Sequence, residues 1–275
     1  MNILLCPFAA EFVTSHSRLR LIESAGVAPR SGRTIQNHIA MKIDAALSPL
    51  EIDLLPGLDL TGTTAVVFDV LFTTSSMITA LANGAAALYP VTTMKEAQEL
   101  KGLLPDALLA GERHGQRFDG FDLGNSPLDY RWLSANRIIT LTTNASIALR
   151  ACAKAGKVLV GSLLNMGALV AHLKDANPAN LLLVCAGTIR EPALEDLFAA
   201  GMLCSNFKGE ELTDAAKITG SVFRKYQENA LHCLHESRKG RSLMADNRRE
   251  DVRWCAHRSL YAVVAGMVDG VVCRI

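Results

Sequence analysis

Hydrophobic and polar residues alternate in blocks along most of the chain. From Leu60 onward, a short run rich in Val, Ile, Leu and Ala is followed by a turn and then by a helix-like stretch of about ten residues. The expected strands are 64–68, 86–91, 106–110, 137–141, 157–160 and 181–184, and the expected helices are 75–82, 94–103 and 145–155. Short strands that alternate with helices form βα units around a largely parallel sheet. The pattern therefore predicts an α/β fold.

The first forty residues do not share this rhythm. Residues 1–40 lack the strand–helix alternation, and they also lack a basic segment followed by a long apolar one. At Met41 the segment MKIDAALSPLEIDLL has the character of the start of a folded domain. We therefore expect residues 1–40 to be a loosely ordered N-terminal extension, or the result of an upstream start-codon choice. Residues 41–275 form the expected α/β domain.

Composition narrows the class of protein. With 275 residues, the chain can bury the core of one large domain or two small ones, and 49% of it is hydrophobic while only 5% is aromatic. A formal net charge of +1 gives no reason to expect a nucleic-acid partner. No apolar run approaches the roughly 20 residues that a membrane helix needs, so no membrane partner is expected. Unmatched strand edges are compatible with a homodimer.

The cysteines indicate a reducing compartment. There are seven, with no Cys-x-x-Cys pair: Cys6, Cys152, Cys185, Cys204, Cys233, Cys255 and Cys273. An odd, unspaced set favours reduced thiols and a cytoplasmic protein. Cys185 lies between Val184 and Ala186 without a Cys-x₅-Arg loop, which favours a buried structural thiol over a nucleophile. His232 and His235 share a helix face, but no further ligand lies nearby in sequence, so we do not expect a metal there.

Polar residues gather where the predicted strands end. They are Asp69, Glu112, Thr142, Thr143, Asn144, Ser162 and Thr188. Each alone is explained as a turn former or helix N-cap. Together they follow five strands, and ligands bind outside the carboxyl ends of strands in open α/β sheets. We therefore predict a binding site at this edge.

The loop GERHGQRFDGFDLGNSPLDY at 111–130 suggests the chemistry of that site. Carboxylates at Asp69, Glu112 and Asp122 suit a hard cation such as Mg²⁺. Helix N-termini after the strands present free N–H groups that suit a phosphate. A metal ion next to a phosphate-binding site is typical of enzymes that catalyse phosphoryl transfer. The chain has neither a Walker A loop nor a Gly-x-Ser-x-Gly elbow.

Several motifs, read together, closely resemble the 2-phosphosulfolactate phosphatase family. They are MKID…LSPLEIDLL (41–55), VVFDVL…TTSSMITALANGA (66–85), PVTTMKEA (90–97), LLAGER…GFDLGNSP (108–127), LTTNASIAL (141–149), VLVGSLLN (158–165) and LVCAGT…ALEDLFAAG (183–201). The resemblance covers essentially residues 41–275. It implies a three-layer α/β/α fold with a largely parallel or mixed sheet. It also implies a Mg²⁺-dependent acid phosphatase acting on a small anionic phosphate ester, (R)-2-phospho-3-sulfolactate, in coenzyme M biosynthesis and sulfolactate metabolism.

The site residues follow from both arguments. The expected catalytic and metal-binding residues are Asp69, Glu112 and Asp122. The expected substrate and phosphate ligands are Arg113, Gly124, Asn125, Ser126, Thr142, Thr143, Asn144 and Arg241. Direct attack by water and an aspartyl nucleophile both remain open as mechanisms.

Some positions depart from the family pattern. Phe72 and Ile147 each stand where the family usually has arginine, Ser259 where aspartate is common, and Lys239 where we would expect histidine. Two lost arginines remove up to two charge-assisted contacts, each worth about 1.5–3 kcal/mol. Two interpretations follow: a Mg²⁺-dependent phosphatase whose substrate has fewer anionic groups, or a catalytically weakened relative that binds a phosphorylated metabolite.

Overall fold

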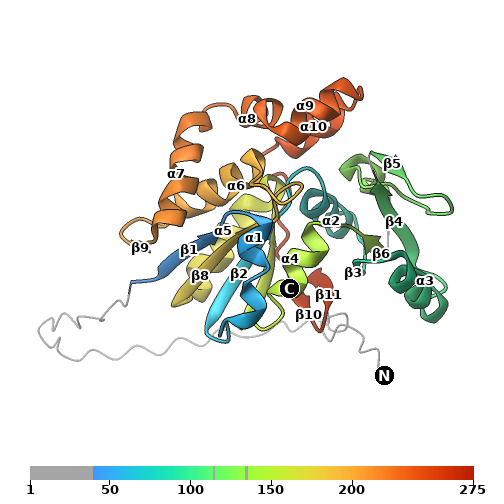
Figure 1. Ribbon diagram of the computed structural model, residues 1–275, viewed down its shortest axis with the longest axis horizontal. Helices are drawn as coiled ribbons and strands as arrows, with labels where there is room; N and C mark the ends of the chain where they lie inside the picture. The colour runs from blue at the N-terminus through green and yellow to red at the C-terminus, as the bar shows by residue number, and fades with distance from the viewer. Residues whose placement is uncertain (1–39, 114, 134–135) are drawn as a thin grey trace, which may run out of the picture.

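The fold is described by a computed structural model covering residues 40–113, 115–133 and 136–275 (Figure 1). The predicted N-terminal extension at 1–40 falls, apart from Ala40, outside the described residues. No helix within the described ranges combines the length and the apolar character needed to cross a membrane.

The described strands form one sheet of 11 strands, in the order β5-β4-β6-β3-β11-β10-β7-β2-β8-β1-β9. One half holds four mutually parallel strands: β1 (Lys42–Ala46), β2 (Thr63–Phe68), β7 (Lys157–Gly161) and β8 (Asn180–Cys185). Their aliphatic sequences, such as TTAVVF and NLLLVC, fit strands that are covered on both faces.

The other half runs in the opposite direction. It holds the parallel strands β3 (Ala87–Val91), β4 (Leu108–Arg113) and β6 (Arg137–Leu141). The hairpin of β10 (Ala265–Val268) and β11 (Val271–Arg274) separates the halves. β10 is antiparallel to β7 and to β11, and β11 is antiparallel to β3, which it meets only at Val272 and Leu88. The sheet is therefore mixed, and the α/β prediction is confirmed with this refinement.

Two-residue strands close both edges of the sheet. They are β5 (Gln116–Arg117), which is antiparallel to the end of β4, and β9 (Glu211–Leu212), which is parallel to β1. Such short edge strands offer little backbone for pairing with another sheet. The homodimer stays a prediction, but the sheet edges no longer argue for it.

Helices cover both faces of the sheet. They are α1 (Pro49–Ile52), α2 (Thr73–Ala82), α3 (Met94–Leu103), α4 (Ala145–Ala151), α5 (Met166–Ala176), α6 (Leu194–Cys204), α7 (Asp214–Tyr226), α8 (Ala230–Glu236), α9 (Arg238–Ala245) and α10 (Arg249–Cys255). Alternate residues of β2 point into different cores: Val66 and Phe68 pack in one cluster, and Ala65 and Val67 in another. This alternation gives the three-layer α/β/α arrangement.

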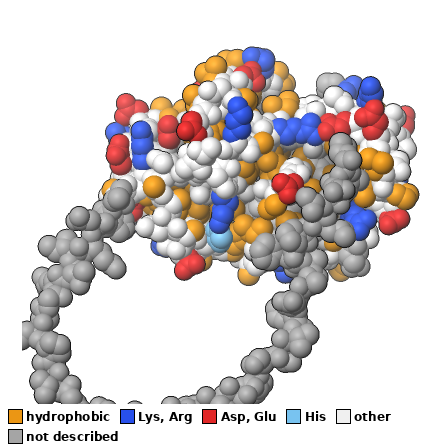
Figure 2. All heavy atoms as spheres, turned by 90° about the horizontal axis from the view of Figure 1, so that it is seen from below, with side chains coloured by type: hydrophobic (Ala, Val, Ile, Leu, Met, Phe, Trp, Pro, Cys, Tyr) orange, Lys and Arg blue, Asp and Glu red, His pale blue; other side chains and the backbone are white. Residues whose placement is uncertain are grey.

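The elements agree with the sequence prediction, with shifted ends. The helix predicted at 145–155 ends at Ala151, and the strand predicted at 106–110 is β4 (Leu108–Arg113), which carries Glu112 inside the strand. Helices α8, α9 and α10, in orange and red in Figure 1, lie together on one side of the molecule. On the face in Figure 2, Lys and Arg side chains are interspersed with Asp and Glu, as the net charge of +1 suggests.

Candidate active site

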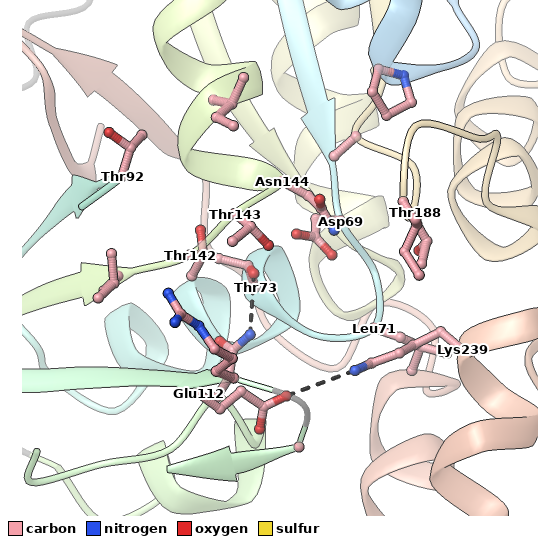
Figure 3. Close-up of a pocket in the computed structure, with 18 of the residues that line it drawn as sticks. Asp69, Leu71, Thr73, Thr92, Glu112, Thr142, Thr143, Asn144, Thr188 and Lys239 are labelled. Carbon is pink, nitrogen blue, oxygen red and sulfur yellow. Dashed lines mark hydrogen bonds and ion pairs between the residues drawn. The ribbon is translucent and has the colours of Figure 1, made fainter. Parts of the chain in front are cut away.

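A cavity of about 940 Å³ is lined by residues from both halves of the sheet. Its lining includes residues from the carboxyl ends of five strands: Asp69, Thr92, Thr142 and Thr188 follow strands, and Glu112 is the next-to-last residue of β4. In Figure 3 the strands that lead to Asp69 and to Thr142 approach the cavity from different sides. The two halves run in opposite directions, yet the carboxyl ends of both converge here.

Asp69 lies at the centre of this convergence. It directly follows β2, and its backbone is fixed because its N–H donates to Thr74 Oγ1 over 3.1 Å. The carboxylate accepts the Ala145 N–H at Oδ2 over 3.2 Å. The residue is only 6% exposed, and this burial raises the pKa of the Asp69 carboxyl above its ordinary value, against hydrogen bonds from Thr73 and the charge of Lys239. Asp69 is thus a buried carboxyl that opens into a cavity.

Two polar segments surround Asp69. Asn125 Nδ2 donates to Thr73 Oγ1 over 3.3 Å (dashed at Thr73 in Figure 3), and Ser76 Oγ donates to the Asn125 carbonyl over 2.8 Å. These bonds hold the loop after β4 against the first turn of α2. Thr143 is exposed and Asn144 half-buried in the cavity wall, directly before α4. Both are placed to meet a small anion.

Thr142 has a structural task. Its Oγ1 accepts the Ser146 N–H over 3.2 Å and lies 2.8 Å from Ser146 Oγ, within the first turn of α4. Its side chain lines the cavity but is already used to cap the helix.

Glu112 reaches the cavity from β4 and is held by two cations. Arg248 Nη1 donates to Glu112 Oε2 over 2.9 Å, and Lys239 Nζ lies 3.8 Å from Oε1. The preceding Gly111 has a φ of +158°, and a Cβ there would lie 2.6 Å from the Leu141 carbonyl oxygen of β6. Only glycine lets β4 approach β6 this closely, so Gly111 places Glu112 at the cavity.

The second basic segment is positioned by another close approach. Lys239 lies near the start of α9, and a Cβ on the next residue, Gly240, would collide with the carbonyl of Leu234 in α8. The backbone of α9 at Gly240 therefore packs directly against the backbone of α8 at Leu234. This contact brings Arg238 and Lys239 to the cavity wall.

Four predicted site residues lie outside the lining of this cavity. The exposed Asp122 accepts the Leu109 N–H at Oδ2 over 2.8 Å, because the loop folds back along β4. Gly124 and Ser126 line a smaller cavity of about 510 Å³ together with Asp122, and Ser126 Oγ bonds Asp251. Arg241 is exposed and donates to the Glu236 carbonyl. Arg238 and Lys239 take the place expected for Arg241.

Ser162 also lies apart from the cavity, although it follows β7. It is fully buried, where it caps the short 3₁₀ helix Leu163–Asn165 and lies 2.9 Å from Ser75 Oγ. Its position after a strand reflects capping. Cys185 is fully buried at the end of β8, and burial raises the pKa of its thiol well above the ordinary value. Such a thiol is structural, as expected from its apolar neighbours.

Two buried carboxyls near the site had not been expected from the sequence. Asp196 accepts the Val70 N–H at Oδ1 over 2.9 Å and the Gly187 N–H at Oδ2 over 3.0 Å. Glu195 is 2% exposed, and its Oε2 has no hydrogen-bond partner within the described residues. Burial, together with the charge of Asp69, raises the pKa of Glu195 to about 7. The sequence does contain a sign of these buried carboxyls, because two adjacent acids stand at the start of the otherwise apolar helix in ALEDLFAAG.

The charges that line the cavity balance. Among the described residues, its lining holds four bases and four acids, a formal sum of zero. The bases are Arg113, Arg190, Arg238 and Lys239. The acids are Asp53, Asp69, Glu112 and Asp246.

The donor set around Asp69 can serve a divalent cation. Mg²⁺ is held by one or two carboxylates, with water and substrate phosphate completing its shell. Asp69 offers a buried carboxylate that a cation would stabilise. Glu112 is already neutralised by Arg248 and Lys239, and within the described ranges no group of three or more His, Cys, Asp or Glu forms a closed metal site. The residues can therefore hold a divalent cation at Asp69, with the rest of its shell left to water and substrate.

Comparison with known proteins adds independent information. The sequence profile of a family described as 2-phosphosulpholactate phosphatase matches residues 51–270. A protein of Thermotoga petrophila named "probable 2-phosphosulfolactate phosphatase" is 37% identical over 210 residues, or 76% of this chain and 90% of the relative. Proteins of the same name from Clostridium perfringens (36% over 240 residues, 84% of this chain and 95% of the relative) and Carboxydothermus hydrogenoformans (38% over 202 residues, 72% and 84%) are also similar.

Proposed function

The chain belongs to the 2-phosphosulfolactate phosphatase family, and we propose that it is a phosphoric monoester hydrolase acting on the 2-phosphate of a small hydroxy acid. The class includes (R)-2-phospho-3-sulfolactate, which gives sulfolactate and inorganic phosphate. The observation that carries the proposal is the buried carboxyl of Asp69 at a cavity where strand ends from both halves of the described sheet converge. The names of the relatives supply the class of reaction.

Asp69 is the proposed catalytic carboxylate. Its backbone is held by Thr74 and its Oδ2 by the Ala145 N–H, so the carboxylate presents a fixed oxygen to the cavity. A preorganised charge in a water-poor site acts more strongly than one in bulk water. Whether Asp69 orients water or attacks phosphorus itself, its role depends on this fixed position.

The phosphate and the carboxylate of the substrate bind to different parts of the cavity wall in this proposal. Thr143, Asn144 and Asn125 lie around Asp69 and offer hydroxyl and amide donors to phosphate oxygens. Arg113 also lines the cavity, with its guanidinium over the Phe118 ring at 5.4 Å and with no acidic partner in the described part of the chain. It is the proposed ligand of the substrate carboxylate.

Mg²⁺ is the proposed cofactor, with Asp69 as its protein ligand. When bound there, such an ion would supply charge neutralisation at the phosphoryl oxygens. Glu112 does not join it as a ligand in this proposal, because Arg248 and Lys239 already hold its oxygens. Glu112 instead positions Lys239 beside the substrate.

We also propose that the protein works in the cytoplasm. Cys152, Cys185, Cys204, Cys233 and Cys255 are buried as free thiols, which suits a reducing compartment.

Phosphate release from a panel of 2-phospho-hydroxy acids tests the proposed function. The panel includes 2-phospho-3-sulfolactate and 2-phospholactate, each with Mg²⁺ and with EDTA. We expect Mg²⁺-dependent release that is lost in Asp69→Asn. A folded wild-type protein that hydrolyses no ester of the panel would sink the proposal.

A further inference from the structure

Resting on the proposed phosphatase function, we propose that the preferred substrate carries an apolar group where sulfolactate carries a sulfonate, and that Ile147 selects it. The proposal concerns the substituent on the third carbon of a 2-phospho-hydroxy acid. It stands on an exposed apolar wall and on the balance of charge in the cavity.

Ile147 is a large apolar side chain that remains open to the cavity. It lies in the first turn of α4, is 46% exposed and belongs to the cavity lining. Thr143 and Asn144, the proposed phosphate donors, lie four and three residues before it. A group attached near the phosphate of a bound ester is therefore within reach of Ile147.

Neighbouring elements extend this apolar surface. Pro49 and Ile52 of α1 line the same cavity, and α1 packs against α4. Ile189, which follows β8, is 76% exposed and also lines the cavity. The backbone of Gly187 lies against the Pro49 ring, where a Cβ would be 2.5 Å from Pro49 Cδ, so the loop after β8 abuts α1. Pro49, Ile147 and Ile189 thus form one apolar wall from three elements, and Ile52, only 2% exposed, adds little to its accessible surface.

The cations of the cavity are mostly committed to carboxylates. Arg190 pairs with Asp53 over 3.3 Å, Lys239 lies 3.8 Å from Glu112, and Arg238 pairs with Glu191. Arg113 is the cation of the lining without an acidic partner in the described part of the chain. Lys239, which shares Glu112 with Arg248, and a metal suit a phosphate, and Arg113 suits one carboxylate. A sulfonate would be a third anionic group. On binding it would lose its hydration and face an apolar wall that offers no cation or hydrogen-bond donor, which is unfavourable.

An alkyl group gains from the same wall. One methylene group in a hydrophobic pocket changes the preference between two substrates by about 10- to 200-fold. Because this wall is open to solvent, we expect a preference at the lower end of that range. We expect a branched alkyl substituent to bind about tenfold more tightly than a sulfonate.

Calorimetry with two unreactive analogues tests the inference. Both are phosphonates in which methylene replaces the ester oxygen; one carries a sulfonatomethyl group and the other an isobutyl group. The wild type is compared with Ile147→Arg, Ile147→Ala and Ile218→Arg, whose Ile218 is 50% exposed on the distant α7. We expect about tenfold tighter binding of the isobutyl analogue by wild type and Ile218→Arg. Ile147→Arg reverses the order, and Ile147→Ala weakens isobutyl binding alone.

The contrary outcomes are distinct. The inference is overturned if wild type binds the sulfonate analogue as tightly as the isobutyl one, if it binds neither, or if Ile147→Arg leaves the ratio unchanged while circular dichroism shows a folded protein. Hydrolysis of the two corresponding esters separates the inference from the proposed function. Tight isobutyl binding without hydrolysis of either ester refutes the phosphatase but supports the selectivity, whereas equal hydrolysis of both refutes the selectivity alone.

Discussion

The guanidinium of Arg248 donates to the carboxylate of Glu112 over 2.9 Å and links the start of α10 to β4, 136 residues away in the chain. Arg248 Nε also donates to Asp251 over 3.2 Å, and its guanidinium carbon lies 4.6 Å from the centre of the Phe72 ring. One side chain therefore joins the C-terminal helices, the loop after β2 and the strand that carries Glu112. The pair is largely buried, with side-chain exposures of 18% and 9%.

Arg248→Ala is expected to destabilise the fold and the site together. Removing one partner of a largely buried pair leaves Glu112 with only the more distant Lys239, and we expect a loss of about 3 kcal/mol in the free energy of unfolding. Urea unfolding measures it, with the exposed Arg249→Ala as the control. A loss in Arg248→Ala no greater than in the control would contradict the role given to this pair.

Asp69→Asn should abolish activity without weakening the fold. The amide keeps the shape of the buried carboxyl but has no charge to bury, so we expect the free energy of unfolding to hold or rise. We expect kcat/KM to fall by about a thousandfold or more, in the range found when a preorganised charge is lost. Asp122→Asn is the matched control, because Asp122 lies outside the cavity, and it should retain activity within about twofold.

Local pattern predicted the strands and the polar residues at their ends, because burial on both faces imposes aliphatic runs. Asp69, Glu112 and Asn144 come from three strands and do line one cavity. The sequence did not reveal that the two halves of the sheet run in opposite directions. That reversal depends on the β10–β11 hairpin, which inserts at the centre of the sheet from the far end of the chain.

Side-chain direction was the other limit of prediction. Lys239 and Arg241 are two residues apart on α9, and residues at this spacing face different sides of a helix. The phase of the helix is set by the contact of Gly240 with α8, which no local pattern shows. The sequence therefore identified the segment, and the structure places Lys239 rather than Arg241 at the cavity wall. Asp122 lies outside the cavity lining for a similar reason, because the bonding of the loop to Leu109 turns its carboxylate away.

Lys239→Met tests this assignment. The ammonium lies 3.8 Å from Glu112, and its charge lowers the pKa of Asp69 against the larger effect of burial. Without it, Glu112 keeps only Arg248 and the site loses a cation beside the substrate, so we expect kcat/KM to fall about a hundredfold, the lower end of what one lost electrostatic contact costs. Arg241→Met, on the exposed side of α9, should change kcat/KM less than about threefold. Equal losses in both variants would refute the assignment.

Stability in EDTA should fall as pH rises through the pKa of Glu195. Burial raises the pKa of this carboxyl to about 7, so the folded protein binds a proton that the unfolded chain has released. The stabilisation is complete below the unfolded pKa of about 4.3 and is lost as pH rises to about 7, for a total of roughly 4 kcal/mol. Urea unfolding between these pH values measures it. Glu195→Gln should make this fall smaller but not remove it, because burial also raises the pKa of Asp69 and of Asp196. The exposed Glu250→Gln should leave the fall unchanged; a wild-type curve that rises over this interval would contradict the prediction.

Mg²⁺ should stabilise the protein more strongly at pH 8 than at pH 6. Burial raises the pKa of Asp69, so protons compete with the metal for its carboxylate at the lower pH. A ligand at a hundred times its Kd adds about 2.7 kcal/mol to the free energy of unfolding, which corresponds to a rise in Tm of about 5 °C or more for a chain of this size. Thermal unfolding with Mg²⁺ and with EDTA at the two pH values provides the measurement, independently of turnover. The rise should vanish in Asp69→Asn and persist in Asp122→Asn; an equal rise in Asp69→Asn, or no dependence on pH, would remove Asp69 from the metal site.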